Sequence, residues 1–170
     1  MSQKLQAGVE MPRFALPAVA GGEIQVGGSG RWQLVVVYRG KHCPKCKAYL
    51  GQLEALKADF AKVDTEIVTL SCDPREKAEA TAEEWQVTLP LGYDLSIAQA
   101  RDLGLYVSEP RSAQETDRPF AEPGLFVVNP EGKAQIIDIS NAPFARPDLA
   151  QIAGAIGFIQ DKGYPIRGTG

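Results

Sequence analysis

The chain has 170 residues, of which 44% are hydrophobic and 23% charged, and its formal net charge at pH 7 is −3. That length suits one globular domain, the composition excludes a chain disordered throughout, and the acidic balance argues against nucleic acid as a partner. The longest wholly apolar run, residues 34–38, is far shorter than the ~20 residues that span a bilayer, so we expect no membrane partner.

Cysteine usage narrows the class of protein further. The chain has three cysteines and one histidine, and its first residues carry no apolar signal region. These features exclude a secreted scaffold held together by disulfides. We therefore expect a cytoplasmic protein whose cysteines do chemistry or bind a metal ion.

The first half of the chain predicts a hairpin, a buried strand and a helix. Residues 12–19 and 23–26 flank Gly21-Gly22, which is typical of a β-hairpin. Residues 34–38 are continuously apolar and β-branched, which indicates a strand buried on both faces. A helix is expected from about Pro44 because apolar side chains recur there at helical spacing: Cys46, Tyr49, Leu50, Leu53, Leu56 and Phe60.

Residues 66–72 predict a second buried strand, and two helices are expected after it. Asp73 is the expected N-cap of the first helix, with Pro74 at the first helical position. Residues 89–93 predict a short strand, after which Asp94 is expected to cap the second helix. That helix should end at Gly104.

The last third of the chain predicts a long loop, a hairpin and a final helix. Residues 106–123 are polar and contain three prolines, and loops of this length are often functional. Residues 125–128 and 134–139 predict paired strands, and a helical apolar stripe from Leu149 to Ile159 stops near Gly163. This order of elements predicts an α/β fold in one domain, residues 1–170, with helices on both faces of a mixed sheet.

The sharpest motif is Cys43-Pro44-Lys45-Cys46, where the first buried strand meets the helix after it. Pro44 at the first helical position makes Cys43 the N-cap and places Cys46 one turn into the helix. The sulfur of Cys43 can then accept a backbone N–H and feel the positive end of the helix dipole. The spacing also allows the two thiols to close a reversible disulfide.

Charge around the motif also favours a thiolate. Between Glu23 and Glu54 there is no acidic residue, whereas five basic residues fall in that window: Arg31, Arg39, Lys41, Lys45 and Lys47. We therefore predict a depressed pKa and solvent access for Cys43, with Cys46, on the apolar stripe, less exposed. This asymmetry indicates that Cys43 attacks and Cys46 resolves.

Two alternatives to redox chemistry stay open at this point. A zinc site would require Cys43, Cys46, Cys72 and His42 together, the only soft ligands in the chain, and would make the protein a zinc-binding or redox-sensing module. The cysteines could also be small buried hydrophobic side chains and nothing more.

Three segments together resemble the alkyl hydroperoxide reductase/thiol-specific antioxidant group of the peroxiredoxin and thioredoxin-like superfamily. They are Met11-Pro12-Arg13-Phe14-Ala15-Leu16, the block from Val35 through Cys46, and Pro123-Gly124-Leu125-Phe126-Val127-Val128-Asn129-Pro130-Glu131-Gly132. The resemblance implies a thioredoxin-like fold with an N-terminal β-hairpin extension and an inserted segment. It also implies an oxidoreductase that reduces hydroperoxides with thiol donors and needs no bound cofactor.

The motif departs from the peroxiredoxin pattern Pro-x-x-x-Thr/Ser-x-x-Cys. If Cys46 is set on the peroxidatic cysteine, Arg39 stands at the proline and Cys43 at the Thr or Ser. The peroxiredoxin alignment therefore favours Cys46 as nucleophile and the thioredoxin alignment favours Cys43. Pro123 stands about where the family's later arginine is expected and resembles the cis-proline of thioredoxins, so we predict a cis Glu122–Pro123 bond.

The substrate and the donor consequently remain a choice between stated classes. The substrate is a hydroperoxide or, in a general thiol–disulfide exchange enzyme, a protein disulfide, and the reductant is thioredoxin-like or a small thiol. The oligomeric state stays open, with a homodimer among the expected forms.

Four further side chains are candidates for supporting roles. Arg39 is expected to hold negative charge at the thiolate or the peroxide oxygen, and Arg118 in the long loop is a candidate for the missing arginine. His42 is either a proton acceptor or a solvated loop residue. Cys72 ends the second buried strand on the same side of the sheet as Cys43, as a packing residue or a third redox group.

Overall fold

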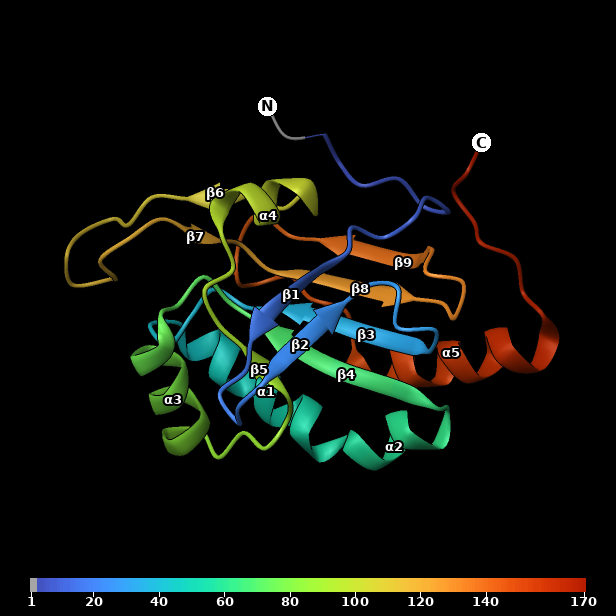
Figure 1. Ribbon diagram of the computed structural model, residues 1–170, viewed down its shortest axis with the longest axis horizontal. Coiled ribbons are helices and arrows are strands. Elements are labelled where there is room, and N and C mark those ends of the chain that lie inside the picture. Colours follow the sequence, from blue (N-terminus) through green and yellow to red (C-terminus); the bar gives the residue numbers. More distant parts are fainter. Residues whose placement is uncertain (1–2) are drawn as a thin grey trace.

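The computed structural model describes residues 3–170 and shows a mixed sheet covered on both faces (Figure 1). The elements in chain order are β1 (Phe14–Pro17), β2 (Glu23–Val26), β3 (Trp32–Val37), α1 (Pro44–Ala55), α2 (Lys57–Lys62), β4 (Thr65–Leu70), α3 (Arg75–Glu84), β5 (Leu91–Gly92), α4 (Ile97–Asp102), β6 (Val107–Ser108), β7 (Phe120–Ala121), β8 (Gly124–Val128), β9 (Ala134–Ile139) and α5 (Leu149–Lys162).

The central sheet has five strands in the order β5-β4-β3-β8-β9. β3 pairs in parallel with β4 and antiparallel with β8, and β8 pairs antiparallel with β9. Because β3 and β4 are parallel, the segments that follow their carboxyl ends lie at the same edge of the sheet. The motif at residues 43–46 follows β3, and Cys72 and Asp73 follow β4, so the topology brings them to one edge.

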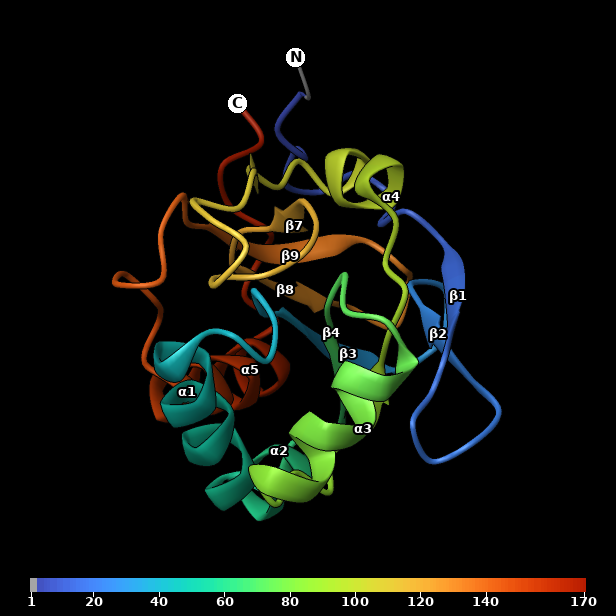
Figure 2. The same ribbon diagram turned by 90° about the vertical axis from the view of Figure 1, so that its left-hand side faces the viewer.

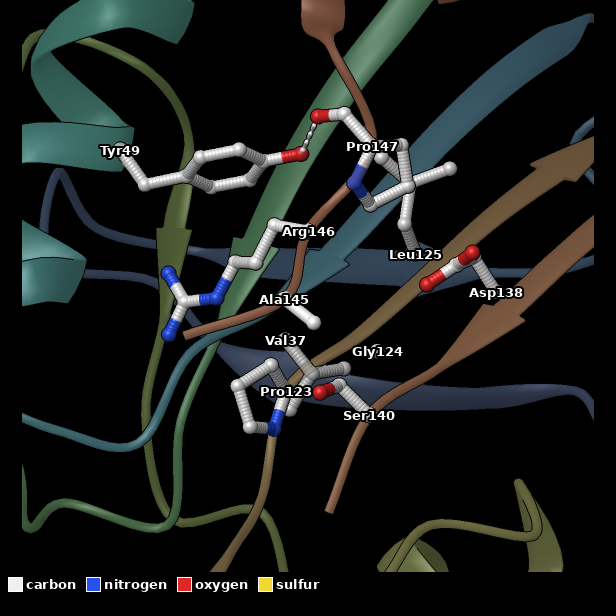
Figure 3. Close-up of a pocket in the computed structure, with 10 residues that line it drawn as sticks. All are labelled: Val37, Tyr49, Pro123, Gly124, Leu125, Asp138, Ser140, Ala145, Arg146 and Pro147. Atoms are coloured by element: carbon white, nitrogen blue, oxygen red, sulfur yellow. Dashed lines mark hydrogen bonds between the residues drawn. The ribbon is translucent and has the colours of Figure 1, made fainter. Parts of the chain in front are cut away.

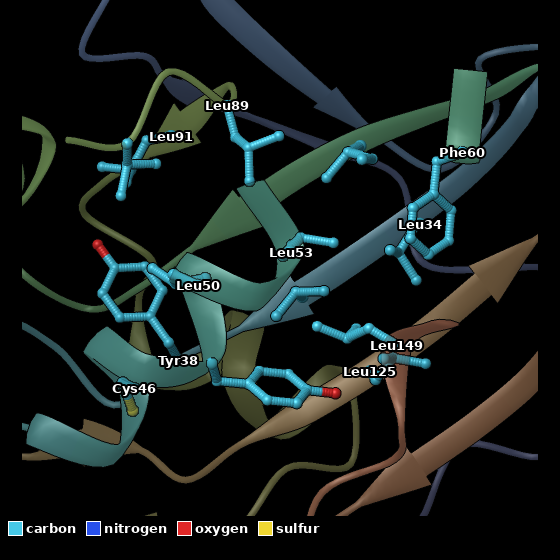
Figure 4. Packing of buried hydrophobic residues seen from close by; sticks show 14 of the residues in the cluster. Leu34, Tyr38, Cys46, Leu50, Leu53, Phe60, Leu89, Leu91, Leu125 and Leu149 are labelled. Atoms are coloured by element: carbon cyan, nitrogen blue, oxygen red, sulfur yellow. The ribbon is translucent and has the colours of Figure 1, made fainter. Parts of the chain in front are cut away.

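Further elements lie over both faces of this sheet (Figure 2), and a hydrophobic core lies on each face. One face is covered by α1, α2, α3 and α5, and its core includes seven leucines, Tyr38, Phe60 and the two motif cysteines. Figure 4 shows part of this core, Cys46 included. The other face is covered by the β1–β2 hairpin, α4 and the β6–β7 pair. The predicted α/β fold with an N-terminal hairpin is therefore confirmed.

The strands most deeply buried are those with continuous apolar sequence. Residues 33–37 of β3 and all of β8 are buried, as expected for strands covered on both faces. The predicted long loop of residues 106–123 contains the short antiparallel pair β6–β7. No helix among the described residues has the length and apolar character needed to cross a membrane.

Helix ends confirm some predictions and correct others. α5 begins at N-cap Asp148, whose carboxylate accepts the N–H of Gln151, and ends at Gly163 in the left-handed conformation. The predicted Asp94 cap is wrong, because Ser96 forms a capping box with Gln99. The helix predicted through Phe60 is interrupted at Leu56, where no Gly or Pro marks the break.

The prediction for Asp73 is also wrong. α3 has Pro74 as its N-cap, with no side-chain hydrogen bond at that end, and begins at Arg75. The carboxylate of Asp73 instead accepts the backbone N–H of Lys41 at 2.8 Å, so it bonds to the loop before the cysteine motif.

Candidate active site

Cys43 is the N-cap of α1, as its spacing to Pro44 predicts. Its backbone is extended, and its sulfur accepts the backbone N–H of Cys46 at 3.3 Å. Pro44 occupies the first turn, where the missing N–H costs no hydrogen bond. The expected solvent access is wrong, because Cys43 is only 1% exposed and Cys46 is fully buried.

Arg39 lies beside Cys43 and forms a partly buried ion pair with Glu122. Its Nε and Nη2 donate to the carboxylate of Glu122 at 2.9 and 3.3 Å, and the Ser108 hydroxyl donates to the same carboxylate at 2.7 Å. The guanidinium also lies 4.8 Å from the centre of the Phe120 ring. This frame fixes a positive charge next to the Cys43 sulfur, in a site where little water screens it.

Hydrogen bonds lower the pKa of Cys43 to about 6. The largest contribution is the hydrogen bond from the Cys46 side chain, and the backbone N–H of Cys46 and the guanidinium of Arg39 add to it. Burial of the thiol opposes this shift. The balance favours a thiolate at neutral pH, in the direction that the sequence predicts.

Cys46 has the opposite character. Burial is the largest cause of its raised pKa, and the neighbouring Cys43 raises the pKa further. Arg146 reduces this effect, and its Nη2 lies 3.0 Å from the Cys46 sulfur. The backbone N–H of Arg39 also lies 3.5 Å from that sulfur. Cys46 is therefore protonated at neutral pH, and Arg146 is placed to stabilise the negative charge on its sulfur when the proton leaves.

Arg146 was not a candidate from sequence. It lies in the segment between β9 and α5, 100 residues from Cys46, and no local pattern indicates that this segment returns to the motif. Tyr49 of α1 holds it in place, because its hydroxyl donates to the Pro147 carbonyl at 2.7 Å and its ring lies 5.0 Å from the Arg146 guanidinium. Figure 3 shows this arrangement.

Pro123 lines a small cavity with Arg146 and Tyr49, of about 10 Å³ (Figure 3). The predicted cis bond at Glu122–Pro123 is wrong, because no peptide bond among the described residues is cis. Pro123 precedes β8, and its carbonyl accepts the N–H of Ser140. The sequence did not predict a role for the neighbouring Glu122, whose carboxylate accepts hydrogen bonds from Arg39.

The other candidates lie away from the two sulfurs or make other contacts. Arg118 forms an exposed ion pair with Asp117 at 3.0 Å. His42 packs against the Phe120 ring at 4.6 Å between centroids, and burial, then the nearby Arg39, lowers its pKa. Burial raises the pKa of Cys72 to about 11. In residues 3–170, no three His, Cys, Asp or Glu side chains are grouped so as to hold a metal ion.

Comparison with known proteins assigns the family. Residues 7–137, well over half of the chain, match the profile of the AhpC/TSA family. A search of curated proteins found no match.

Solved structures share the fold. Peroxidoxin BcpB from Mycobacterium tuberculosis is 19% identical, with a TM-score of 0.72 over 92% of this chain and 97% of its own. AhpC from Enterococcus faecalis is 20% identical, with a TM-score of 0.74 over 96% and 99%. A peroxiredoxin-like protein from Aquifex aeolicus is 13% identical, with a TM-score of 0.77 over 92% and 89%. The chain belongs to the AhpC/TSA family, and it is a thiol-dependent oxidoreductase with a peroxiredoxin-type fold.

Proposed function

We propose that this protein reduces a small hydroperoxide with Cys43 as nucleophile and Cys46 as resolving cysteine. The observation that carries the proposal is the Cys43 sulfur itself: it accepts an N–H at a helix N-terminus, lies beside Arg39 and is almost fully buried. A thiolate so placed is nucleophilic at neutral pH. Its burial admits a small oxidant more readily than a protein disulfide.

The reaction proceeds in two steps inside the motif. The Cys43 thiolate attacks one peroxide oxygen, the O–O bond breaks, and the departing alkoxide takes a proton to leave as an alcohol, or as water from hydrogen peroxide. Cys43 is then a sulfenic acid. The Cys46 sulfur attacks it, the S–O bond breaks, water leaves, and the Cys43–Cys46 disulfide forms.

Two arginines support these steps. Arg39 lies next to Cys43, where it stabilises the thiolate and the negative charge that develops on the departing oxygen. Arg146 donates to Cys46 and stabilises that sulfur as it loses its proton. A cytoplasmic thiol, from a thioredoxin-like protein or a small molecule, supplies two electrons and two protons to restore the dithiol.

The direct test compares peroxide consumption and protein-disulfide reduction with dithiothreitol as donor. With the donor present, wild type should consume hydrogen peroxide and Cys43→Ser should not. Without the donor, Cys46→Ser should react once and accumulate a sulfenic acid trapped by dimedone. Mass analysis of wild type after mild peroxide should show the loss of two hydrogens. Reduction of insulin disulfides without peroxide consumption would replace this proposal by general thiol–disulfide exchange. Accumulation of sulfenic acid in Cys43→Ser would assign the attack to Cys46.

A further inference from the structure

The carboxylate of Asp73 is a buried charge that the proposed reaction does not use. Asp73 follows β4, is 4% exposed, and makes no side-chain hydrogen bond to the helix after it. A buried carboxylate is costly unless its oxygens are hydrogen-bonded. Its Oδ2 accepts the backbone N–H of Lys41 at 2.8 Å.

The amide that donates to Asp73 also bonds to the cysteine motif. The N–H of Lys41 and the carbonyl of Gly40 belong to one planar peptide group. The N–H of that group donates to Asp73, and its carbonyl accepts the N–H of Cys43 at 3.1 Å. Two hydrogen bonds thus connect the Asp73 carboxylate to the backbone of Cys43 through one rigid amide, and bonds in such a chain polarise one another.

At position 40, only glycine allows the Asp73 carboxylate to lie this close to the backbone without strain. Its φ is +139°, in the region that favours glycine, and a Cβ there would lie 2.8 and 3.0 Å from the two carboxylate oxygens of Asp73. The carboxylate therefore packs directly on the Gly40 backbone. The main chain of Asp73 is fixed too, because its N–H donates to the Ser71 hydroxyl and its carbonyl accepts the Asp94 N–H.

We infer that Asp73 is a positioning residue for Cys43: through the Gly40–Lys41 amide it fixes where the attacking sulfur stands at the start of α1. This inference rests on the proposed role of Cys43. Asp73, which follows β4, would thus support the reaction of Cys43, which follows β3. The same hydrogen bond explains why the Asp73 carboxylate does not cap α3.

The test separates loss of the hydrogen bond from loss of charge. Asp73→Asn keeps an oxygen for the Lys41 N–H, so kcat/KM for hydrogen peroxide should stay within about threefold of wild type. Asp73→Ala removes the acceptor, so kcat/KM should fall about tenfold, mainly through kcat, and the pKa of Cys43 should rise by about one pH unit. The pKa is measured by iodoacetamide alkylation against pH in the Cys72→Ser background.

Two further variants keep the test decisive. Gly40→Ala pushes a methyl group against the carboxylate and should reproduce the effect of Asp73→Ala, and combining the two should add little because both break one linkage. Glu84→Gln is the matched control, since Glu84 pairs with the side chain of the same Lys41 at 2.9 Å but does not touch its amide. It should leave both readouts unchanged. If Asp73→Ala does not fold, Asp73→Leu, which also has no acceptor atom and is close to Asp in shape, takes its place with the same expectation.

The outcomes are distinguishable. A folded Asp73→Ala protein with wild-type kcat/KM and Cys43 pKa overturns the inference, and so does an Asp73→Asn protein as impaired as Asp73→Ala, which would assign the effect to charge. A fall in thermal stability alone, with both readouts unchanged, makes Asp73 merely structural. If wild type consumes no peroxide, the proposed function fails, while the alkylation comparison still reports whether Asp73 positions Cys43.

Discussion

Cys43 and Cys46 lie three residues apart at the start of one helix and both are buried, yet their pKa values are displaced in opposite directions. At the N-cap, the Cys43 sulfur accepts the backbone N–H of Cys46, which lies in the first turn and is shared with the Cys43 carbonyl at 3.1 Å. One turn further in, the Cys46 sulfur depends on a 3.0 Å bond from a distant arginine, which does not offset its burial. Burial raises the pKa of both thiols, and the hydrogen-bond donors outweigh it at Cys43 but not at Cys46.

The largest effect on this comparison is expected from removal of Arg39, the arginine beside Cys43. Arg39→Met should lower kcat/KM for hydrogen peroxide by about 100-fold, the scale of losing one preorganised donor, and should raise the pKa of Cys43. Stopped-flow peroxide reduction and alkylation against pH measure the two effects.

A control is needed because Arg39→Met also leaves Glu122 buried without its cation, which is itself destabilising. The double variant Arg39→Met, Glu122→Gln removes that charge and should regain stability without regaining rate. If the double variant recovers wild-type kinetics, Arg39 acts only through folding.

The second test concerns the arginine beside Cys46. Arg146→Met should raise the pKa of Cys46 further and slow disulfide formation about tenfold, because a charge-assisted hydrogen bond to the sulfur is lost. The pKa of Cys43 should not change. Sulfenic acid should persist longer after one equivalent of peroxide, as followed by dimedone trapping and mass spectrometry. Arg118→Met, which removes an exposed arginine paired with Asp117, is the matched control, and an equal effect there would contradict the assignment.

The third test addresses the hydrogen bond between the two thiols, the largest cause of the low Cys43 pKa. Because that pKa is about 6, peroxide reduction should rise as the pH increases from 5 and level off above 7. Cys46→Ala removes the donor and should move this rise toward the free-thiol pKa of about 8.5, whereas Cys46→Ser keeps a hydroxyl donor and should move it less. Single-turnover rates across this pH range give both values. Profiles of both variants that match wild type would show that the Cys46 thiol is not needed and that the backbone N–H and Arg39 set the pKa of Cys43.

The same shift has a consequence for stability. The folded-state pKa of Cys43 lies below that of the unfolded thiol, so folding favours release of its proton. This contribution is fully present above the unfolded-state pKa of about 8.5 and is lost as the pH falls through about 6.

The sequence predicted the parts of this site that depend on local spacing. Pro44 places Cys43 at the N-cap, and the apolar stripe places Cys46 inside the helix, and both follow from helical geometry. The contacts of Arg146 and Glu122 could not be predicted, because they join segments far apart in the chain.

Asp73 shows a different limit of the sequence. Its spacing to Pro74 and Glu76 fits an N-cap, but the parallel pairing of β3 with β4 offers its carboxylate the Lys41 amide instead. The tertiary contact thus overrides a valid local signal. The basic window around the motif predicted the sign of the Cys43 shift. Arg39 of that window is among its causes, and the hydrogen bonds from the Cys46 side chain and backbone contribute more.

The smallest expected effect is at Cys72, the third cysteine at this edge of the sheet. Burial raises its pKa to about 11, with the nearby Asp73 adding to the shift against a backbone hydrogen bond at Ala121. Almost none of it is thiolate at pH 7, so Cys72→Ala should change kcat/KM for peroxide by less than about twofold. The lost sulfur leaves a small cavity in the core that Cys72 shares with Leu70 and Phe126, which should cost about 1 kcal/mol of unfolding free energy. Urea unfolding measures that cost. Alkylation of native wild type tests the difference in ionisation, and it should label Cys43 long before Cys72. A large kinetic loss in Cys72→Ala at unchanged stability would make Cys72 a third redox group and would require a contact to the Cys43–Cys46 pair that opens during turnover.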